Sequence, residues 1–488
     1  MIQKMKLIVT PLALAMALSG CMSLAPKYER PAAPVAPAFP ELPKAGGTTL
    51  PTATSEAPSN LSWQRFFADA RLRQLIELSL TNNRDLRVAI LNIEQARAQY
   101  RITRADRAPT VSAIVSGSRQ STGDDQPTQN IYQAGFGVSA FELDLFGRVR
   151  NLSEAALSQF LATEEARKTT HISLVASVAN TYLTMLADDE LLALTQQTLK
   201  TREESDRLTR LRFENGVVSK LELQQSVSLV EGARAELARF QRQRAQDANL
   251  LTLLVGQPIP ENLAPGATLA STELPDLPAG MPSDLLTARP DIRAAEQQLI
   301  AANANIGAAR ANYFPRISLT GSVGSASTEL SGLFKSGSFG WTFAPQAVLP
   351  LFDLGRIRAG VDAAKAGQGI AVAQYEKSIQ TAFREVADAL AGQATFSEQL
   401  RAQRAVAVAE QDRFNLSDLR YKSGAASYLD LLDAQRSLFD AQRSSVEANL
   451  LRLQNQVTLY RVLGGGWTIP ATATTAANAA TTTNPSRQ

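Results

Sequence analysis

The sequence contains two copies of one pattern, and this internal duplication constrains the fold more than any other feature. Residues 82–87 match residues 288–293 at an offset of 206, and later positions recur at an offset of 208. The positions that recur at 208 are Leu208, Leu211, Arg212, Gly216, Ser219, Leu221, Leu223 and Gly256, which return as Leu416, Leu419, Arg420, Gly424, Ser427, Leu429, Leu431 and Gly464. A period of roughly 207 residues is too long for a solenoid unit, so we expect two copies of one structural half.

Proline divides the chain further. Prolines are concentrated in residues 26–58 and 258–290 and are absent from residues 128–257 and 351–469. Because proline removes a helical donor and clashes with the preceding turn, the first two stretches predict extended segments and the last two can form long helices. The predicted segments are a signal peptide (1–20), a strap (21–61), a first repeat (62–257), a linker (258–283), a second repeat (284–467) and a disordered tail (468–488).

Both repeats show the same order of elements: a helix, a β-hairpin, a long helix and a return helix. The first helix is expected over residues 70–107 and again over 284–312. In the second strand of each hairpin, apolar and polar residues alternate. The apolar positions are Tyr132, Ala134, Phe136, Val138 and Ala140 in the first repeat and Phe339, Trp341, Phe343 and Ala347 in the second. Alternating strands of about ten residues are typical of transmembrane β-strands, and a soluble hairpin domain is the alternative.

Four strands are too few to close a barrel, which needs about eight. An open sheet edge in lipid leaves backbone groups unpaired, at a cost of several kcal/mol each. Membrane-embedded strands therefore predict an oligomer that shares one barrel. Two copies would give a filled interior, whereas three copies would leave room for a lumen.

The long helices carry a heptad pattern. Residues 151–212 predict a helix of roughly 93 Å at 1.5 Å per residue. The apolar positions spaced by seven are Val178, Met185, Leu192 and Leu199. Charges interrupt this pattern throughout, which indicates coiled-coil packing and not a membrane span. Gly216 and Gly424 end the long helices, and return helices run from there to Gly256 and Gly464.

The residue composition argues against most catalytic and metal-binding chemistry. The chain has one His, one Cys and a net charge of +3. Such a chain has no Cys/His metal cluster, no Cys-His nucleophile pair and no strong attraction to nucleic acid. No phosphate-binding glycine loop is found either, so we expect no enzyme, no metal and no cofactor. His171 is expected to be a surface or packing residue.

The N-terminus predicts a lipid anchor. Lys4 and Lys6 precede an apolar stretch over residues 7–18 that is too short to span a bilayer. Leu18, Ser19 and Gly20 then precede Cys21, a run that resembles a bacterial lipobox. The resemblance implies that Cys21 is acylated and becomes the mature N-terminus, and several acyl chains would hold the protein to a membrane. An ordinary signal peptide with a chance Cys is the alternative. The residue after Cys21 is Met, not Asp, which favours sorting to the outer membrane.

Taken together, the motifs of the chain resemble the TolC family of outer-membrane efflux channels, and within it the lipidated OprM-type branch. The segments that carry the resemblance are 18–21, 145–148, 302–310, 421–424, 428–438 and 463–467. The resemblance implies a mainly α fold with β: long coiled-coil helices in a periplasmic α-barrel, and a transmembrane β-barrel to which each chain of a homotrimer gives four strands. It also implies an equatorial region, a periplasmic adaptor protein and an inner-membrane resistance-nodulation-division pump as partners, and transport of drugs or other small toxic compounds.

The same resemblance places the functional residues at the ends of the long helices. Asp430 and Asp433 match acidic gate positions, and Leu429 matches a hydrophobic constriction. The turn residues Gly216, Val217, Val218, Gly424 and Ala425 match the tips that meet the adaptor. In a trimer, six carboxylates would surround one opening and attract cations. The alternative function is a trimeric coiled-coil structural or adhesive lipoprotein without a pore. The exported substrate cannot be identified from the residues.

Overall fold

The computed structural model describes residues 23–40, 61–121, 128–277 and 289–467. Cys21, the signal peptide and the tail therefore lie outside the described residues, and the segment boundaries predicted above stay predictions. The chain divides into two compact units, and each draws on both repeats. One comprises residues 1–33, 91–165 and 293–378, and the other comprises residues 34–90, 166–292 and 379–488.

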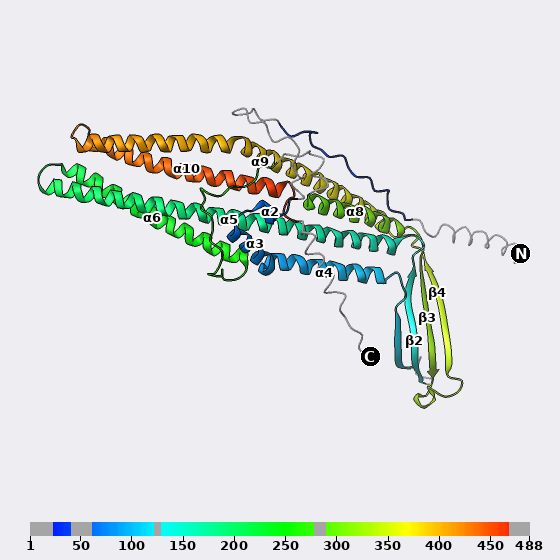
Figure 1. The fold of residues 1–488 in the computed structure, drawn as a ribbon. Coiled ribbons are helices and arrows are strands. Elements are labelled where there is room, and N and C mark those ends of the chain that lie inside the picture. Colours follow the sequence, from blue (N-terminus) through cyan, green and yellow to red (C-terminus); the bar gives the residue numbers. More distant parts are fainter. Residues whose placement is uncertain (1–22, 41–60, 122–127, 278–288, 468–488) are drawn as a thin grey trace. The chain divides into compact units, whose positions relative to one another are not determined.

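Long helices and one small sheet make up the fold, which confirms the predicted class (Figure 1). The helices are α2 (Trp63–Phe66), α3 (Ala70–Asn82), α4 (Arg84–Ala105), α5 (Arg148–Glu214), α6 (Lys220–Val255), α8 (Pro290–Ala311), η2 (Leu330–Gly332), α9 (Arg356–Lys422) and α10 (Tyr428–Val462). The strands are β1 (Val111–Gln120), β2 (Gln129–Leu143), β3 (Arg316–Ser327) and β4 (Phe339–Val348). No helix in the described ranges combines the length and the apolar character needed to cross a membrane.

Residues 70–107, predicted as one helix, form two. Asn83 has an extended backbone with ψ of 133° and separates α3 from α4. Its side-chain oxygen accepts from Leu86 N–H at 2.9 Å, and its amide donates to the Leu254 carbonyl at 3.0 Å. Asn83 thus caps α4 and ties it to the end of α6, which compensates for the broken helix.

The four strands form one antiparallel sheet in the order β1-β2-β3-β4. Strand alternation separates an apolar face from a polar face. Apolar side chains line a groove on one face: Val111, Phe136, Val138, Phe141, Leu319, Val323 and Phe343. On the opposite face Ser322 and Thr342 share a hydrogen bond of 2.7 Å between their hydroxyls. Among the described residues, β1 and β4 each pair with one strand only.

A β-bulge in β2 departs from the predicted alternation. Between Val138 and Phe141 the pairing with β3 shifts, and Ala140 adopts a φ of +50°. The Ala140 N–H donates to Thr320 Oγ1 at 3.1 Å, which partly compensates for the lost ladder bond. The bulge shifts the register of the last residues of β2, where Glu142 pairs with Ser318.

The first described residues form an extended strap along α8, within the unit that contains the sheet. Ser23 donates to Asn151 at 2.7 Å, and Asn303 donates to the Pro26 carbonyl at 2.8 Å. Arg30 binds both carboxylate oxygens of Glu296 at 2.7 and 2.8 Å. The strap therefore binds α8 through specific side chains and not only through its prolines.

Candidate functional site

Two helical hairpins, α5–α6 and α9–α10, carry the residues for which the sequence predicts a function. Gly216 and Gly424 adopt φ of +68° and +77°, the left-handed conformation that ends a helix. The following N–H groups, of Val217 and Ala425, return to the carbonyls of Arg212 and Arg420 at 2.8 Å. Both predicted helix ends are therefore real turns with the same geometry.

Each return helix begins with a serine cap. Ser219 Oγ accepts from Glu222 N–H at 3.2 Å at the start of α6. Ser427 Oγ accepts from Asp430 N–H at 3.2 Å at the start of α10, and Asp430 accepts from Ser427 N–H at 3.1 Å. Asp430 therefore completes a capping box and is held at a fixed position on the first turn of α10.

The two predicted gate acids have different surroundings. Asp430 is exposed, and its bonds from Ser427 keep the pKa of its carboxyl below its usual value. Asp433 is paired with Arg413 of α9, which also contacts Glu410 at 3.1 Å and Ser437 at 3.3 Å. Among the described residues no ion pair involves Asp430. Asp430 therefore keeps its negative charge uncompensated by a contact, whereas Arg413 offsets the charge of Asp433.

Apolar side chains are exposed at both turns. Leu429, the predicted constriction residue, is 61% exposed, and its repeat mate Leu221 is 67% exposed. Val217 is 63% exposed, and Ala425 lies exposed at the second turn, whereas Val218 is half-buried. The single chain thus leaves these leucine and valine side chains unburied at both turns.

Sequence reasoning missed the contacts that join the two hairpins behind these turns. Arg212 Nη1 donates to the Tyr421 hydroxyl at 2.6 Å, and its guanidinium lies 5.3 Å from the centre of the Tyr421 ring. Below this pair, Leu229 of α6 packs with Leu431 and Leu432 of α10. These contacts hold the first turn of α10, and with it the predicted gate residues, against the first hairpin.

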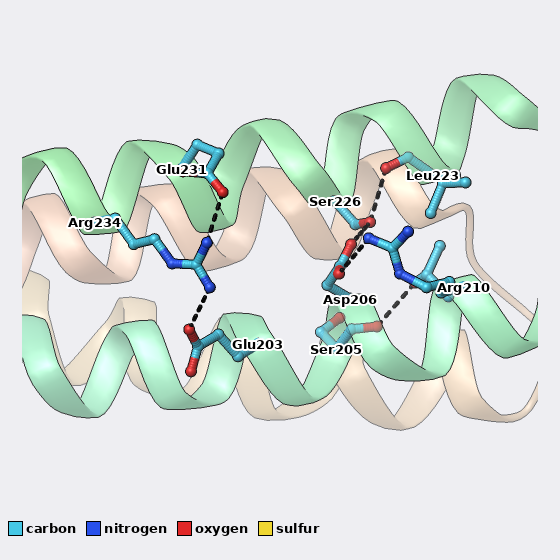
Figure 2. Close-up of polar contacts among 9 residues, drawn as sticks. Glu203, Ser205, Asp206, Arg210, Leu223, Ser226, Glu231 and Arg234 are labelled. Atoms are coloured by element: carbon cyan, nitrogen blue, oxygen red, sulfur yellow. Dashed lines mark hydrogen bonds and ion pairs between the residues drawn. The ribbon is translucent and has the colours of Figure 1, made fainter.

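The two hairpins differ in how their own helices are joined. In the first, Arg234 of α6 bridges Glu203 of α5 at 2.9 Å and Glu231 at 2.7 Å (Figure 2). Asp206 accepts from Ser226 Oγ at 2.6 Å and from Arg210 at 3.1 Å. The residues that correspond to Glu203 and Arg234 in the second repeat, 208 positions later, are Gln411 and Gln442. Their side-chain amides form a neutral contact of 3.5 Å. At these positions an ion pair connects the helices of the first hairpin and an amide contact those of the second, in which Arg413 and Asp433 form an ion pair elsewhere.

Within the described ranges, no group of His, Cys, Asp and Glu side chains could hold a metal ion. His171 is half-buried, and burial, with a smaller contribution from Arg167, lowers its pKa to about 4. The histidine is therefore neutral at neutral pH and packs near the backbone of Gly466, in agreement with the packing role expected for it.

Comparison with known proteins gives consistent results. The sequence pattern of the family described as outer membrane efflux protein matches residues 75–257 and 281–465. The antibiotic efflux pump outer membrane protein ArpC of Pseudomonas putida and the toluene efflux pump outer membrane protein TtgC of the same species are each 51% identical over 461 residues, or 93% of this chain and 94% of theirs. The crystal structure of the open MtrE outer membrane channel of Neisseria gonorrhoeae superimposes with a TM-score of 0.82 at 41% identity, covering 91% of this chain and 99% of that chain.

Proposed function

The chain belongs to the outer membrane efflux protein family, and we propose that it is the outer-membrane conduit of a tripartite efflux pump. In this role it passively carries drugs or other small toxic compounds that a partner pump delivers. The relatives reported above are efflux proteins, which supports a channel over a structural rod without a pore. The observation that carries the proposal is a four-stranded sheet with one apolar face, one polar face and two free edges.

The free edges support a homotrimer. A sheet of this size in lipid must be completed by other strands, and identical copies supply them through β1 and β4. Three copies provide twelve strands, enough to enclose a water-filled lumen lined by the polar faces.

A comparison of the repeats supports the same assembly and indicates which helices meet. In the second repeat, α8 buries a row of residues against α5, α9 and the strap: Leu299, Ala301, Ala304, Ile306, Ala308 and Ala311. Its counterpart α4 leaves Leu91 and Ile102 exposed, and Leu86 is its only buried residue among those described. Helix α8 thus has neighbours on both sides. Helix α4 contacts α5, where Tyr100 stacks on Phe160 at 6.4 Å, but its other side has no such cover among the described residues. We infer that α9 of a second copy covers α4.

This inference predicts a specific cross-link. Ala155 of α5 packs with Ala304 of α8. The repeat counterpart of Ala155 is Ala363 of α9, 208 residues later, and the counterpart of Ala304 is Ala98 of α4, 206 residues earlier. Both of these alanines are exposed in the single chain. Ala98→Cys combined with Ala363→Cys should give covalent dimers and trimers on mild oxidation or with a short bis-maleimide, measured by denaturing electrophoresis. Each single variant is the control and should stay monomeric under denaturation. A double variant that also stays monomeric would contradict this arrangement of copies.

The gate lies, in this proposal, at the first turn of α10. Leu429 supplies an apolar constriction and Asp430 and Asp433 supply negative charge, and a ring of acids attracts cations. Because Arg413 offsets the charge of Asp433, we assign most of the cation attraction to Asp430.

We therefore expect the purified protein to carry small, cation-selective currents in planar bilayers. Asp430→Asn combined with Asp433→Asn should shift the reversal potential in a KCl gradient away from its cation-selective value, because two negative charges per chain are lost. Glu236→Gln is the matched control, since this half-buried acid lies outside the predicted gate and pairs with Arg239 on the same helix. If neither the wild type nor the variant carries a current, the result would favour the structural rod without a pore. If the variant carries currents of unchanged selectivity, the two acids are not gate residues.

The turn residues Gly216, Val217, Val218, Gly424 and Ala425 form, in this proposal, the docking surface for a periplasmic adaptor protein, which links the channel to an inner-membrane resistance-nodulation-division pump. The exposed apolar side chains of Val217 and Ala425 support this role. A lipid on Cys21 anchors the protein in the outer membrane, from which it extends into the periplasm. The strap that follows Cys21 is bound to α8, so an anchor there would be connected directly to the helical wall.

A further inference from the structure

A group of charged residues lies where β2 ends and where β3, α5 and α9 begin. We call Glu142, Arg148, Arg316 and Arg356 the collar. Arg148 donates to both carboxylate oxygens of Glu142 at 2.7 and 2.6 Å, and Arg316 donates to one of them at 2.6 Å. One acid is thus shared by two arginines. These three residues line a cavity, and Arg356 lines it too.

The sheet register places the collar on the polar face. Glu142 pairs with Ser318, and Arg316 lies two residues before Ser318 on the same strand. Leu319, one position further along, lines the apolar groove on the other face. Because side chains alternate along a strand, Arg316 and Glu142 share the face that carries Ser322 and Thr342.

Arg316, on an inner strand of the sheet, is exposed within a single chain. The Arg316 side chain is 63% exposed although β3 is paired with β2 on one side and β4 on the other. Neighbouring copies would join only at the outer strands, so they would not pair with β3. The cavity of about 500 Å³ beside Arg316 is lined by three arginines, Arg148, Arg316 and Arg356, and by two acids, Glu142 and Asp144. Its charged lining therefore sums to one positive charge per chain.

The second repeat keeps the arginine of this pair but not the glutamate. At an offset of 208, Arg148 corresponds to Arg356, the first residue of α9, whereas Glu142 corresponds to Pro350. The arginine is thus present at both helix starts, but the glutamate that binds Arg148 has no counterpart in the second repeat. At the start of α9, Asp353 accepts from the N–H groups of Gly355 and Ile357 at 3.0 and 2.8 Å.

We propose that the collar is a second selectivity element of the channel, which favours anions and anionic compounds on the lumen side of the sheet. The proposal rests on the proposed function, because the polar faces enclose a lumen only in the assembled channel. The collar belongs to the unit that contains the sheet, whereas the acidic gate residues belong to the other unit. The channel would then contain two charged regions of opposite sign, and the collar would set the preference once the gate acids are removed.

The test uses planar bilayers and the full-length Asp430→Asn and Asp433→Asn protein as background. In a KCl gradient this background should be anion-selective, and adding Arg316→Gln should raise the permeability ratio of K⁺ to Cl⁻ at least about twofold, the factor that corresponds to one unit charge acting on an ion across several ångströms of water. Arg316→Lys should leave the ratio unchanged because it keeps the charge. Glu142→Gln should shift the ratio in the opposite direction.

Arg358→Gln is the matched control, since this arginine is also exposed at the start of α9 but lies outside the cavity lining. If the background and the Arg316→Gln protein show the same permeability ratio, the collar is not a selectivity element. Its ion pairs would then only stabilise the end of the sheet. Absence of any current from the wild type would instead contradict the channel itself. The two failures are therefore distinguishable.

Discussion

Replacing Gly324 with alanine is expected to abolish formation of the sheet and, with it, recovery of the protein from the outer membrane. Gly324 of β3 lies opposite Gly135 of β2. A Cβ on Gly324 would lie 2.3 Å from the Ala134 carbonyl oxygen and 2.6 Å from Gly135 Cα. A Cβ on Gly135 would meet the Val323 carbonyl oxygen at 2.3 Å. Because the obstructing atoms belong to the backbone, no side-chain rotation relieves the clash.

The cost should exceed about 3 kcal/mol, the upper range for overpacking in a site that can relax. The measurement is the amount of heat-modifiable oligomer in the outer-membrane fraction. Gly340→Ala is the matched control, because Gly340 lies on the other side of Gly324 in the same row and a Cβ there meets nothing within 4 Å. Normal amounts of the Gly324→Ala oligomer would show that the two strands are not held this closely in the assembled protein.

The row of glycines shows what the sequence could and could not predict about the sheet. Alternation predicted the strands and their faces, because the pattern reports directly which face meets apolar surroundings. The predicted length of about ten residues is wrong for β2, which has 15. The bulge at Ala140 was not predictable, since an extra residue in one strand is defined only by its pairing with the other. The close approach of Gly135 and Gly324 is a property of two segments that are 189 residues apart, which a local pattern does not encode.

The same limit applies to the candidate site. Gly216 and Gly424 could be identified because each acts on its own helix end. The serine caps were not predicted, although they act equally locally. The pairing of Asp433 with Arg413 depends on how α9 packs against α10, so the two acids appeared equivalent in the sequence although their surroundings differ. The contact between Arg212 and Tyr421 likewise joins two hairpins and was not expected. Residues that function through their own turn are thus predictable, and residues that function through a partner helix are not.

The first hairpin contains a buried acid pair that should make its stability depend on pH. Asp188 of α5 is 4% exposed, and its carboxyl is hydrogen-bonded to that of Asp247 on α6. Its Oδ2 has no partner among the described residues. Asp189 and Arg244, which form an ion pair of 2.9 Å, are the other charged groups acting on the pair. Burial, followed by the bond to Asp247 and repulsion from its charge, raises the pKa of Asp188 to about 7.

The sign of the effect follows from this raised pKa. An acid whose pKa is higher in the folded than in the unfolded state favours folding while it is protonated, so stability should fall as the pH rises from about 4 through 7 and level off above. The shift corresponds to an upper bound of about 4 kcal/mol, and contact with solvent at Asp247 should reduce it to about 2 kcal/mol. Asp188→Asn cannot ionise, so it should remove most of this loss.

We therefore expect Asp188→Asn to raise the thermal unfolding temperature at pH 8 and to change it little at pH 5, measured on the detergent-solubilised protein. Asp189→Asn is the matched control: its carboxylate is exposed and paired with Arg244, so its loss should not reduce the pH dependence. Equal pH dependence in the wild type and Asp188→Asn would mean that the pair is ionised in the folded protein. Since Phe396 and Asn455 occupy the corresponding positions of the second repeat, the second hairpin has no such pair, and the pH effect should be confined to the first.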